Sequence, residues 1–378
     1  MSSLFQKPTD LLVPEGISFL SFNKDFTEIA LSKKDHIIYI YSIPTLLKIV
    51  TWRPILKLES HTQYISGLDW SPETNKILSC SYDKTSFVWE FIDNKWTASR
   101  VISNEKLGYI CCKWNKRGDK FCEGTSSKQL IIGYYNKISK RWVCNNIKAH
   151  KSSVVACEID PSSLYIISGS TDLKVCISSC YIPEIDDKYL TEENKHLTKD
   201  FGQIIYEFES NSWINSVTWL NGVLGLVSCQ DATFTIIDLN EQKSKIILFN
   251  HSPINILIPN GEKSFYAVCY DRNVLEYEKK DDAWEIKRYI TSEKNYLENK
   301  KNIHKIITEP KKEFNISNSI KVCRFKPRNF SCYREVKDTI KCKKFPYLHQ
   351  SLISSVNLKN GEIMISSDLS GFVKFWKL

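Results

Sequence analysis

Short apolar runs separated by polar turns cover most of the chain, and residues 64–102 show the pattern in full. The runs YISGLDW, KILSCS, TSFVWEF and WTASRVI are separated by the turn sequences SPETN, YDK and DNK. The runs are short, apolar and rich in aromatic residues, and helical periodicity is almost absent. The pattern therefore predicts a unit of four consecutive strands.

The same unit recurs along the whole chain. If the aspartate of SYDKTSFVW is the anchor, with an aromatic or apolar position six residues later, seven segments match, at Asp35, Asp83, Lys128, Asp172, Asp231, Asp271 and Ser370. Successive anchors lie 48, 45, 44, 59, 40 and 99 residues apart, and four of these gaps fit the roughly 40–45 residues of a propeller blade. A four-stranded sheet alone cannot bury both faces, whereas radial stacking of sheets covers them. The sequence therefore predicts an all-β protein, a single seven-bladed WD-repeat β-propeller over residues 1–378, with insertions in the two longer gaps.

A histidine, a serine and an aspartate recur at fixed spacing in two of these units. The residues concerned are His61, Ser79, Asp83 and Trp89 in the second unit, and His150, Ser168 and Asp172 in the fourth. In a blade the aspartate would lie in the turn between the second and third strands, where it accepts from backbone amides and from the histidine ring. The trio also suggests a hydrolase, but no GxSxG motif accompanies it. We expect a structural hydrogen-bond chain and no catalytic residue.

Composition is ordinary for a globular protein, with 42% hydrophobic and 25% charged residues. The N-terminus has no signal-peptide pattern, and no run approaches the roughly 18 apolar residues of a membrane helix. We expect an intracellular protein with no integral membrane contact, whose thirteen cysteines are free thiols. No CxxC, GxGxxG or GxxxxGK[ST] motif occurs, so we expect no metal, no cofactor and no small-molecule substrate.

Three stretches carry a resemblance to a known family. Ala-Leu-Ser at residues 30–32 precedes the first anchor, ISGLDWSP opens the second unit, and an inter-blade loop of about residues 181–203 begins Tyr181-Ile182 and ends Phe201-Gly202-Gln203. Through residues 17–285 and again in the last blade, the chain resembles the WD-repeat subunit (subunit 1) of the actin-related protein 2/3 (Arp2/3) complex. The resemblance implies a non-catalytic scaffold subunit that supports nucleation of branched actin filaments. It further implies the other subunits of that complex and the actin filament as partners, and a location in the cytoplasmic actin cytoskeleton, with the nucleus possible.

The long gap before the last blade holds a basic insertion of about residues 289–346. Residues 286–346 contain 17 Lys and Arg and 6 Asp and Glu, a net charge of +11, whereas the whole chain carries +9. Between a cap at Thr291 or Ser292 and a stop at Pro310, the pattern predicts an amphipathic helix. The candidate partner-binding residues of this arm are Tyr296, Leu297, Lys300, Lys301, Ile303, Lys305 and Ile307.

Three roles for the insertion stay open. Its apolar stripe could dock on the propeller, its helix could be presented to actin, or its charge could bind nucleic acid or an acidic membrane surface. The usual arm sequence of the family is not recognisable, so no individual contact is carried over. The alternative function is a WD-repeat adaptor that binds nucleic acid or another acidic partner through this insertion.

Overall fold

The computed structural model describes residues 10–13, 15–42, 54–190, 197–248, 252–280, 283–290, 351–359 and 363–377. The chain divides into two compact units, one of Met1–Ile290 with His349–Leu378 and one of Thr291–Leu348. Every candidate residue of the predicted arm, from Tyr296 to Ile307, belongs to the second unit and lies outside the described residues. The described helices, α1 (Pro183–Asp186) and the 3-10 helix η1 (Asp187–Tyr189), are far too short to cross a membrane.

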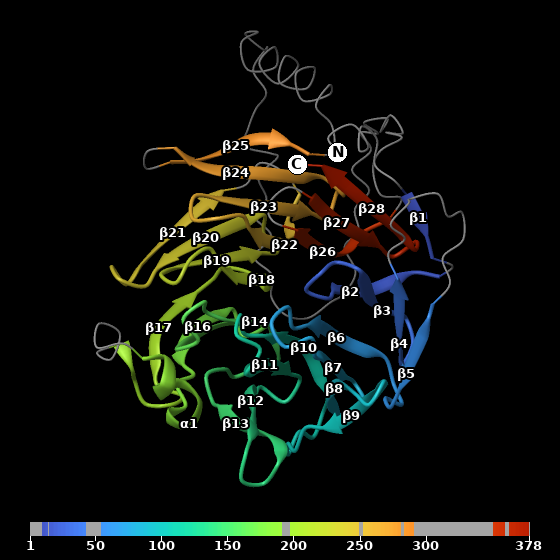
Figure 1. The fold of residues 1–378 in the computed structure, drawn as a ribbon. Helices are drawn as coiled ribbons and strands as arrows, with labels where there is room; N and C mark the ends of the chain where they lie inside the picture. The colour runs from blue at the N-terminus through green and yellow to red at the C-terminus, as the bar shows by residue number, and fades with distance from the viewer. Residues whose placement is uncertain are drawn as a thin grey trace, which may run out of the picture. The chain divides into compact units, whose positions relative to one another are not determined.

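Seven four-stranded antiparallel sheets make up the first unit (Figure 1). Sheets one to three comprise β2 (Ile17–Phe22), β3 (Glu28–Lys33), β4 (Ile37–Ser42), β5 (Leu56–Glu59); β6 (Ile65–Trp70), β7 (Ile77–Ser81), β8 (Ser86–Ile92), β9 (Lys95–Arg100); and β10 (Tyr109–Trp114), β11 (Lys120–Thr125), β12 (Leu130–Asn136), β13 (Arg141–Ile147). Sheets four to six comprise β14 (Val154–Ile159), β15 (Tyr165–Ser170), β16 (Lys174–Ser179), β17 (Ile204–Glu209); β18 (Ile214–Trp219), β19 (Leu224–Cys229), β20 (Thr233–Asp238), β21 (Lys243–Leu248); and β22 (Ile254–Pro259), β23 (Ser264–Cys269), β24 (Val274–Lys280), β25 (Ala283–Tyr289). Sheet seven comprises β26 (Ile353–Lys359), β27 (Ile363–Asp368), β28 (Phe372–Lys377) and β1 (Asp10–Leu12). The predicted seven-bladed β-propeller is confirmed.

One predicted anchor is wrong by one residue. The residue after Asp83 is Lys84, which has a left-handed φ of 68°, and the residue with the same conformation in sheet three is Lys128, with a φ of 72°. Ser127, not Lys128, therefore occupies the anchor position of that turn. The polar run TSSKQ contains no aspartate, so the sequence alone offered no marker for the register. The other six anchors lie between the second and third strands of their blades, as predicted.

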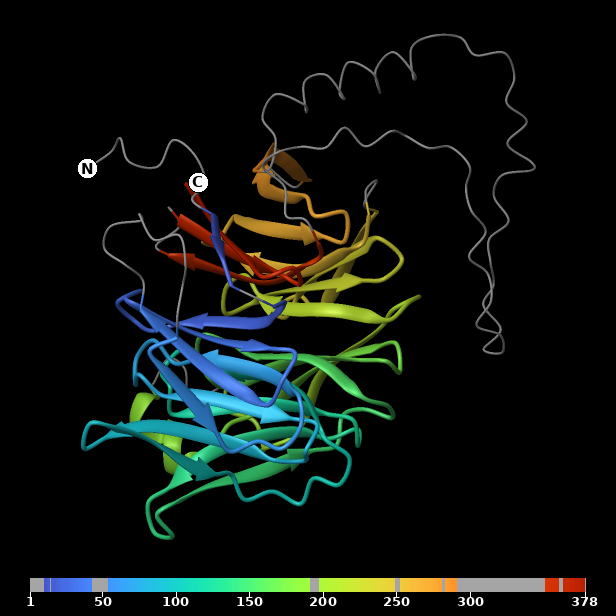
Figure 2. The same ribbon diagram turned by 90° about the vertical axis from the view of Figure 1, so that its right-hand side faces the viewer.

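The ring closes because the first strand of the chain joins the last sheet. β1 pairs antiparallel with β28, and Figure 2 draws it in blue beside the red C-terminal strands. Val13 N also donates to Gly371 O at 2.9 Å. Gly371 has a φ of 91°, and a methyl group added there would lie 2.1 Å from Val13 O and 2.4 Å from Glu15 O. Only glycine tolerates both the backbone conformation and this close approach.

Polar contacts join the first strands of neighbouring sheets around the whole ring. They run from Ser21 Oγ to Asp69 Oδ1 (3.3 Å), Trp114 N to Asp69 Oδ2 (2.8 Å), Lys113 Nζ to Glu158 Oε2 (2.6 Å), Trp219 Nε1 to Glu158 O (3.0 Å), Asn215 Nδ2 to Ile254 O (3.0 Å), Asn255 Nδ2 to Ile353 O (3.2 Å) and Ser355 Oγ to Leu20 O (3.0 Å). Together they link each sheet to the next and sheet seven back to sheet one. Since hydrogen bonds are directional, they set the alignment of neighbouring blades, which apolar packing alone leaves less defined.

The apolar core is divided among the interfaces between blades. Seven clusters of buried residues are found in the described chain, and each draws its side chains from two neighbouring sheets. Between sheets one and two, for example, Ile38 packs with Trp70 and Trp89. Burying one such side chain contributes about 1.5–3 kcal/mol. Every blade therefore depends on both of its neighbours to cover its faces.

We expect Gly371→Ala to lower the thermal unfolding midpoint, because the added methyl group would collide with the backbone that leads into β1. The matched control is Gly261→Ala, since Gly261 also has a positive φ, of 77°, but nothing within 4 Å of the added carbon. Both changes carry the backbone cost of about 1 kcal/mol or more, and only Gly371→Ala adds the collision. Equal midpoints for the two variants would contradict the importance of this closure.

Candidate functional site

The second blade contains the polar residues predicted from its histidine, serine and aspartate. Trp89 Nε1 donates to Ser79 Oγ at 2.9 Å, and that oxygen lies 2.9 Å from His61 Nε2. His61 Nδ1 in turn lies 3.1 Å from Asp83 Oδ2. Because His61 Nδ1 faces the Asp83 carboxylate, which can only accept, this nitrogen carries the proton and donates it, and His61 Nε2 is left to accept from the Ser79 hydroxyl. The four groups form one directional chain that ends at the turn.

Serine, histidine and aspartate also follow one another in this order in a hydrolytic triad, but here the side chains are buried and a substrate has no access to them. Ser79 is 0% exposed and His61 is 4% exposed. A nucleophilic serine must be reachable by a substrate carbonyl, whereas this hydroxyl is enclosed and already accepts from Trp89. The arrangement fits a structural role, which stays a prediction until these residues are substituted.

Asp83 ties two loops together. Its carboxylate accepts from Thr62 N at 2.8 Å and from Thr85 N at 2.9 Å, as well as from the Thr85 hydroxyl. Burial raises the pKa of Asp83, but the hydrogen bonds from His61, Thr85 and Thr62 outweigh it and lower that pKa well below its ordinary value. A carboxyl with a lowered pKa stabilises the fold above its unfolded pKa of about 4, and the stabilisation is lost as the pH falls through the folded pKa.

The fourth blade has a shorter version of this series of hydrogen bonds. His150 Nε2 lies 2.8 Å from Ser168 Oγ, and Lys151 N donates to Asp172 Oδ2 at 2.7 Å. His150 Nδ1 is 3.4 Å from Asp172 Oδ2, an ion-pair distance without hydrogen-bond alignment. Ser178 stands where the second blade has tryptophan, and its hydroxyl has no hydrogen-bond partner among the residues described. In place of an indole partner, the Ser168 hydroxyl has the backbone oxygen of Cys176, to which it donates at 3.3 Å.

The third blade has a comparable link between its incoming loop and its turn, made by different residues that were not predicted from the sequence. Ser127 in the turn donates to Glu105 Oε2 at 2.6 Å, and Glu105 Oε1 accepts from Leu107 N at 2.8 Å. The acidic residue, Glu105, thus lies on the incoming loop, and the serine lies in the turn. A signal existed, because Glu105 precedes Ser127 by 22 residues, the offset that separates His61 from Asp83.

A buried carboxyl, also missed, lies inside the same blade. Glu123 on β11 takes the place that Ser79 has on β7, and it is 0% exposed. Its Oε1 accepts from the Ser86 hydroxyl of the neighbouring blade, while its Oε2 has no partner among the described residues. Burial, with a smaller contribution from the charge of Glu105, raises the pKa of Glu123 to about 8. Glu123 is therefore protonated at neutral pH, as a carboxyl in apolar surroundings must be.

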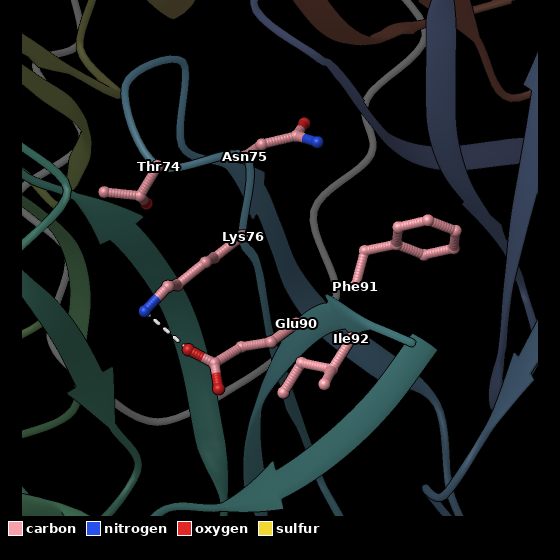
Figure 3. Close-up of a pocket in the computed structure, with 6 residues that line it drawn as sticks. All are labelled: Thr74, Asn75, Lys76, Glu90, Phe91 and Ile92. Carbon is pink, nitrogen blue, oxygen red and sulfur yellow. Dashed lines mark ion pairs between the residues drawn. The ribbon is translucent and has the colours of Figure 1, made fainter. Parts of the chain in front are cut away.

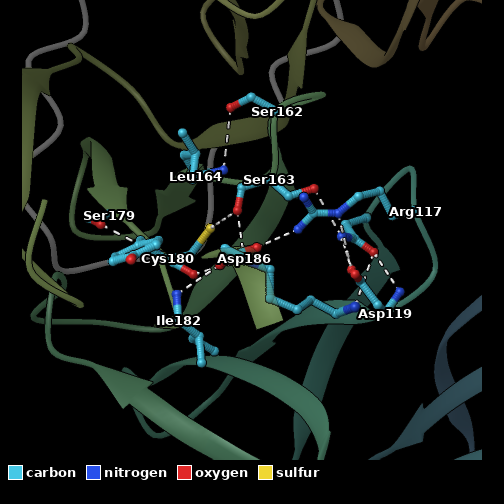
Figure 4. Close-up of polar contacts among 12 residues, drawn as sticks. Arg117, Asp119, Ser162, Ser163, Leu164, Ser179, Cys180, Ile182 and Asp186 are labelled. Atoms are coloured by element: carbon cyan, nitrogen blue, oxygen red, sulfur yellow. Dashed lines mark hydrogen bonds and ion pairs between the residues drawn. The ribbon is translucent and has the colours of Figure 1, made fainter. Parts of the chain in front are cut away.

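The inter-blade loop begins with a clamp built on a buried ion pair (Figure 4). Lys120 Nζ on β11 donates to Asp186 Oδ2 of α1 at 2.7 Å, to Ser163 O at 2.6 Å and to Cys180 O at 3.0 Å. Both charged side chains are 0% exposed. All three ammonium protons are used, which is the condition under which such a buried charge is tolerated. Arg117 pairs with the other oxygen of Asp186.

This clamp positions one part of the loop predicted at residues 181–203. Ile182 N donates to Asp186 Oδ2 at 2.8 Å, and the Ile182 side chain is buried in the core between sheets three and four. At the far end, Gly202 N donates to Ser179 O at 2.9 Å. Residues 181–190 and 197–203 are thus held against the propeller, while residues 191–196 lie outside the described chain.

A shallow groove lies on the second blade, between the loop that leads into β7 and the end of β8 (Figure 3). Its lining residues are Thr74, Asn75, Lys76, Glu90, Phe91 and Ile92. Lys76 Nζ and Glu90 Oε1 form an ion pair at 2.5 Å, and Phe91 and Ile92 are each about half exposed. In the part of the chain that the structure describes, no three His, Cys, Asp or Glu side chains are placed to hold a metal ion. This groove presents apolar and paired polar surface rather than a reactive group.

Comparison with known proteins agrees with the architecture. Residues 52–90 and 142–177 match the family described as WD domain, G-beta repeat, and these two segments include both His–Asp pairs. The chain is 28% identical to actin-related protein 2/3 complex subunit 1A of Arabidopsis thaliana over 286 residues. The matched region covers 74% of this chain and 75% of that protein. It is 29% identical over 264 residues to subunit 1A-B of Xenopus laevis, covering 68% and 70%. Subunit 1 of Schizosaccharomyces pombe is 21% identical over 242 residues, covering 62% and 64%.

We expect Asp83→Ala to lower the free energy of unfolding by about 1–3 kcal/mol, because His61 and two backbone amides would lose their acceptor. The control is Asp231→Ala in the fifth blade, where the carboxylate accepts from the amide and hydroxyl of Thr233 at 3.2 and 2.6 Å. Denaturant titration of both variants measures the difference, and the control should lose less. An unchanged stability of Asp83→Ala, together with loss of a hydrolytic activity, would refute the structural role.

We expect Glu123→Gln to stabilise the protein more at pH 8 than at pH 5. The folded wild type keeps Glu123 protonated up to a pKa of about 8, whereas the unfolded chain ionises it near pH 4.3. The wild type therefore loses stability as the pH rises between these values, and glutamine, neutral in both states, does not. Thermal unfolding across this pH range tests the sign, with the exposed Glu73→Gln as control. Parallel stability curves for wild type and Glu123→Gln would contradict the burial of an ionisable carboxyl.

Proposed function

From the homology of this chain to the WD-repeat subunit 1 proteins of the Arp2/3 complex, we propose that it is a non-catalytic scaffold subunit of such a complex. The observation that carries the proposal is the relationship to subunit 1A, which extends over 74% of the chain. In this role the protein supports nucleation of branched actin filaments in the cytoplasmic actin cytoskeleton. Its partners are the other subunits, and a nuclear pool is the alternative location.

The described structure supports a binding role through its rigidity. Seven shared cores and a ring of polar contacts hold the blades in fixed positions. A surface that keeps its shape before binding loses less conformational entropy when a partner docks. The His61 chain contributes to this rigidity from inside a blade, and it offers no group to a substrate.

The basic insertion is the proposed filament contact. Its net charge of +11 over residues 286–346 exceeds that of the whole chain, so it could approach an acidic protein such as actin by electrostatic attraction. The proposed contact residues of the arm keep their sequence-based assignment: Tyr296, Leu297, Lys300, Lys301, Ile303, Lys305 and Ile307. The same charge also favours the alternative of an adaptor for nucleic acid or another acidic partner.

Two proposals, the scaffold role and the filament contact of the insertion, are tested by affinity purification. The tagged full chain is compared with a variant that lacks residues 291–345. We expect both forms to recover actin-related proteins, because a surface insertion contributes little to blade packing. Only the full chain should support sedimentation of the complex with actin filaments, and this binding should weaken as salt rises. Mass spectrometry identifies the partners, and a salt series of co-sedimentation measures the contact.

A matched charge control separates a specific arm from general basicity. Lys300, Lys301 and Lys305 changed together to Ala should reduce the salt dependence of filament binding. The same change in charge on the propeller, at the exposed Lys84, Lys106 and Lys128, should not. Purification without actin-related proteins would refute the scaffold proposal, and equal filament binding by both forms would refute the arm alone. Preferential recovery of nucleic acid would favour the adaptor.

A further inference from the structure

Two consecutive cysteines on the first strand of blade three contact cysteines of the two neighbouring blades. Cys111 Sγ lies 3.6 Å from Cys157 Sγ on β14 of blade four. Cys112, which points to the other face of β10, contacts Cys80 on β7 of blade two. All four are free thiols. Blade three therefore has a thiol pair on each side.

Glycines make the room for both pairs. A carbon added at Gly124 would lie 2.7 Å from Cys111 Sγ, and one added at Gly67 would lie 2.8 Å from Cys80 Sγ and 2.9 Å from Cys112 Sγ. Neither site would accommodate a larger residue without moving the sulfur. The pairs thus occupy space that the surrounding backbone leaves to them.

Exposure distinguishes the two pairs. Cys80 and Cys112 are 0% and 6% exposed, and Cys157 is 5% exposed, whereas Cys111 is partly exposed. A dissolved oxidant therefore has better access to Cys111 than to the pair on the other side of the strand. The two pairs share one strand and differ in access, which makes the second an internal control for the first.

We propose that Cys111 and Cys157 form a reversible disulfide between blades three and four when the protein meets a hydroperoxide. Their sulfur atoms must approach from 3.6 Å to about 2.05 Å. Both cysteines belong to the first strands of adjoining sheets, where the neighbouring Lys113 and Glu158 already form a 2.6 Å ion pair. A displacement of this size is within the reach of side-chain rotation and a small shift of the strands.

The reaction balances with the hydroperoxide as the only oxidant. The Cys111 thiolate attacks a peroxide oxygen, the O–O bond breaks, and Cys111 becomes a sulfenic acid while hydroxide, or alkoxide from an organic hydroperoxide, leaves and takes up a proton. Cys157 sulfur then attacks the Cys111 sulfur, the S–O bond breaks, and the hydroxyl leaves as water with the Cys157 proton. One peroxide is reduced by two electrons, and two thiols become one disulfide.

The surroundings of Cys157 make it the second thiol to react. Hydrogen bonds with Cys111 and Cys122, followed by burial, raise the pKa of Cys157 well above that of a free thiol. It therefore stays protonated and unreactive toward the oxidant until a sulfenic acid forms beside it. Cys122, buried on β11, is the competing thiol for Cys157.

Peptide mapping of the folded full chain tests the proposal. Limited hydrogen peroxide, alkylation and non-reducing trypsin digestion should yield residues 107–113 linked to residues 152–174. Dithiothreitol should separate the two peptides. The link should persist in Cys112→Ser and disappear in Cys111→Ser and in Cys157→Ser. Circular dichroism before digestion establishes that each variant is folded, so a missing link is not due to unfolding.

Three outcomes would overturn the proposal. In the first, residues 107–113 become linked to residues 77–84, the peptide of Cys80, as readily as to residues 152–174. In the second, Cys157 remains fully alkylated at a peroxide dose that oxidises Cys111. In the third, Cys122 rather than Cys111 is the partner of Cys157, with the link retained in Cys111→Ser.

Discussion

The pairing of β1 with β28 is the contact on which the rest of the propeller depends. Without it, sheet seven would lack its outer strand and β28 would present an unpaired edge. Because each apolar cluster lies between two neighbouring sheets, an opening at one interface exposes side chains on both of its faces. Two glycines permit this close approach, because a Cβ at Gly16 would collide with Leu369 O and one at Gly371 would collide with Val13 O and Glu15 O.

A closed ring explains why individual blades can lose parts of the WD pattern. The second blade has the complete series of hydrogen bonds from Trp89 to Asp83, the fourth lacks the tryptophan, and the third has an acid on the loop and a hydroxyl in the turn. All three retain a polar link between the incoming loop and the turn. The shared cores and the polar contacts between first strands supply the remaining stability, so no single blade must carry every interaction.

The same closure suits a protein whose proposed work is to hold partners in place. Groups that resemble catalytic machinery, including the Ser79–His61–Asp83 series and the protonated Glu123, lie inside blades, where they connect elements. The Lys120–Asp186 pair likewise fixes α1, at the start of the inter-blade loop, to β11. A binding surface on such a rigid propeller is preorganised, so it contributes to assembly by keeping its shape rather than by catalysing a reaction.

Short apolar runs and a turn pattern that recurs along the chain were enough to predict seven blades, since strand formation and turn chemistry are local properties. The 22-residue offset likewise located the His61–Asp83 link, because both residues belong to one blade. The short β1 and its place in sheet seven were not predicted, and neither were the burial of Glu123, the Lys120–Asp186 pair and the meeting of Cys111 with Cys157. These contacts arise only when sheets stack or when the chain ends meet, because residues far apart in sequence become neighbours through the curvature of the ring and not through any local pattern.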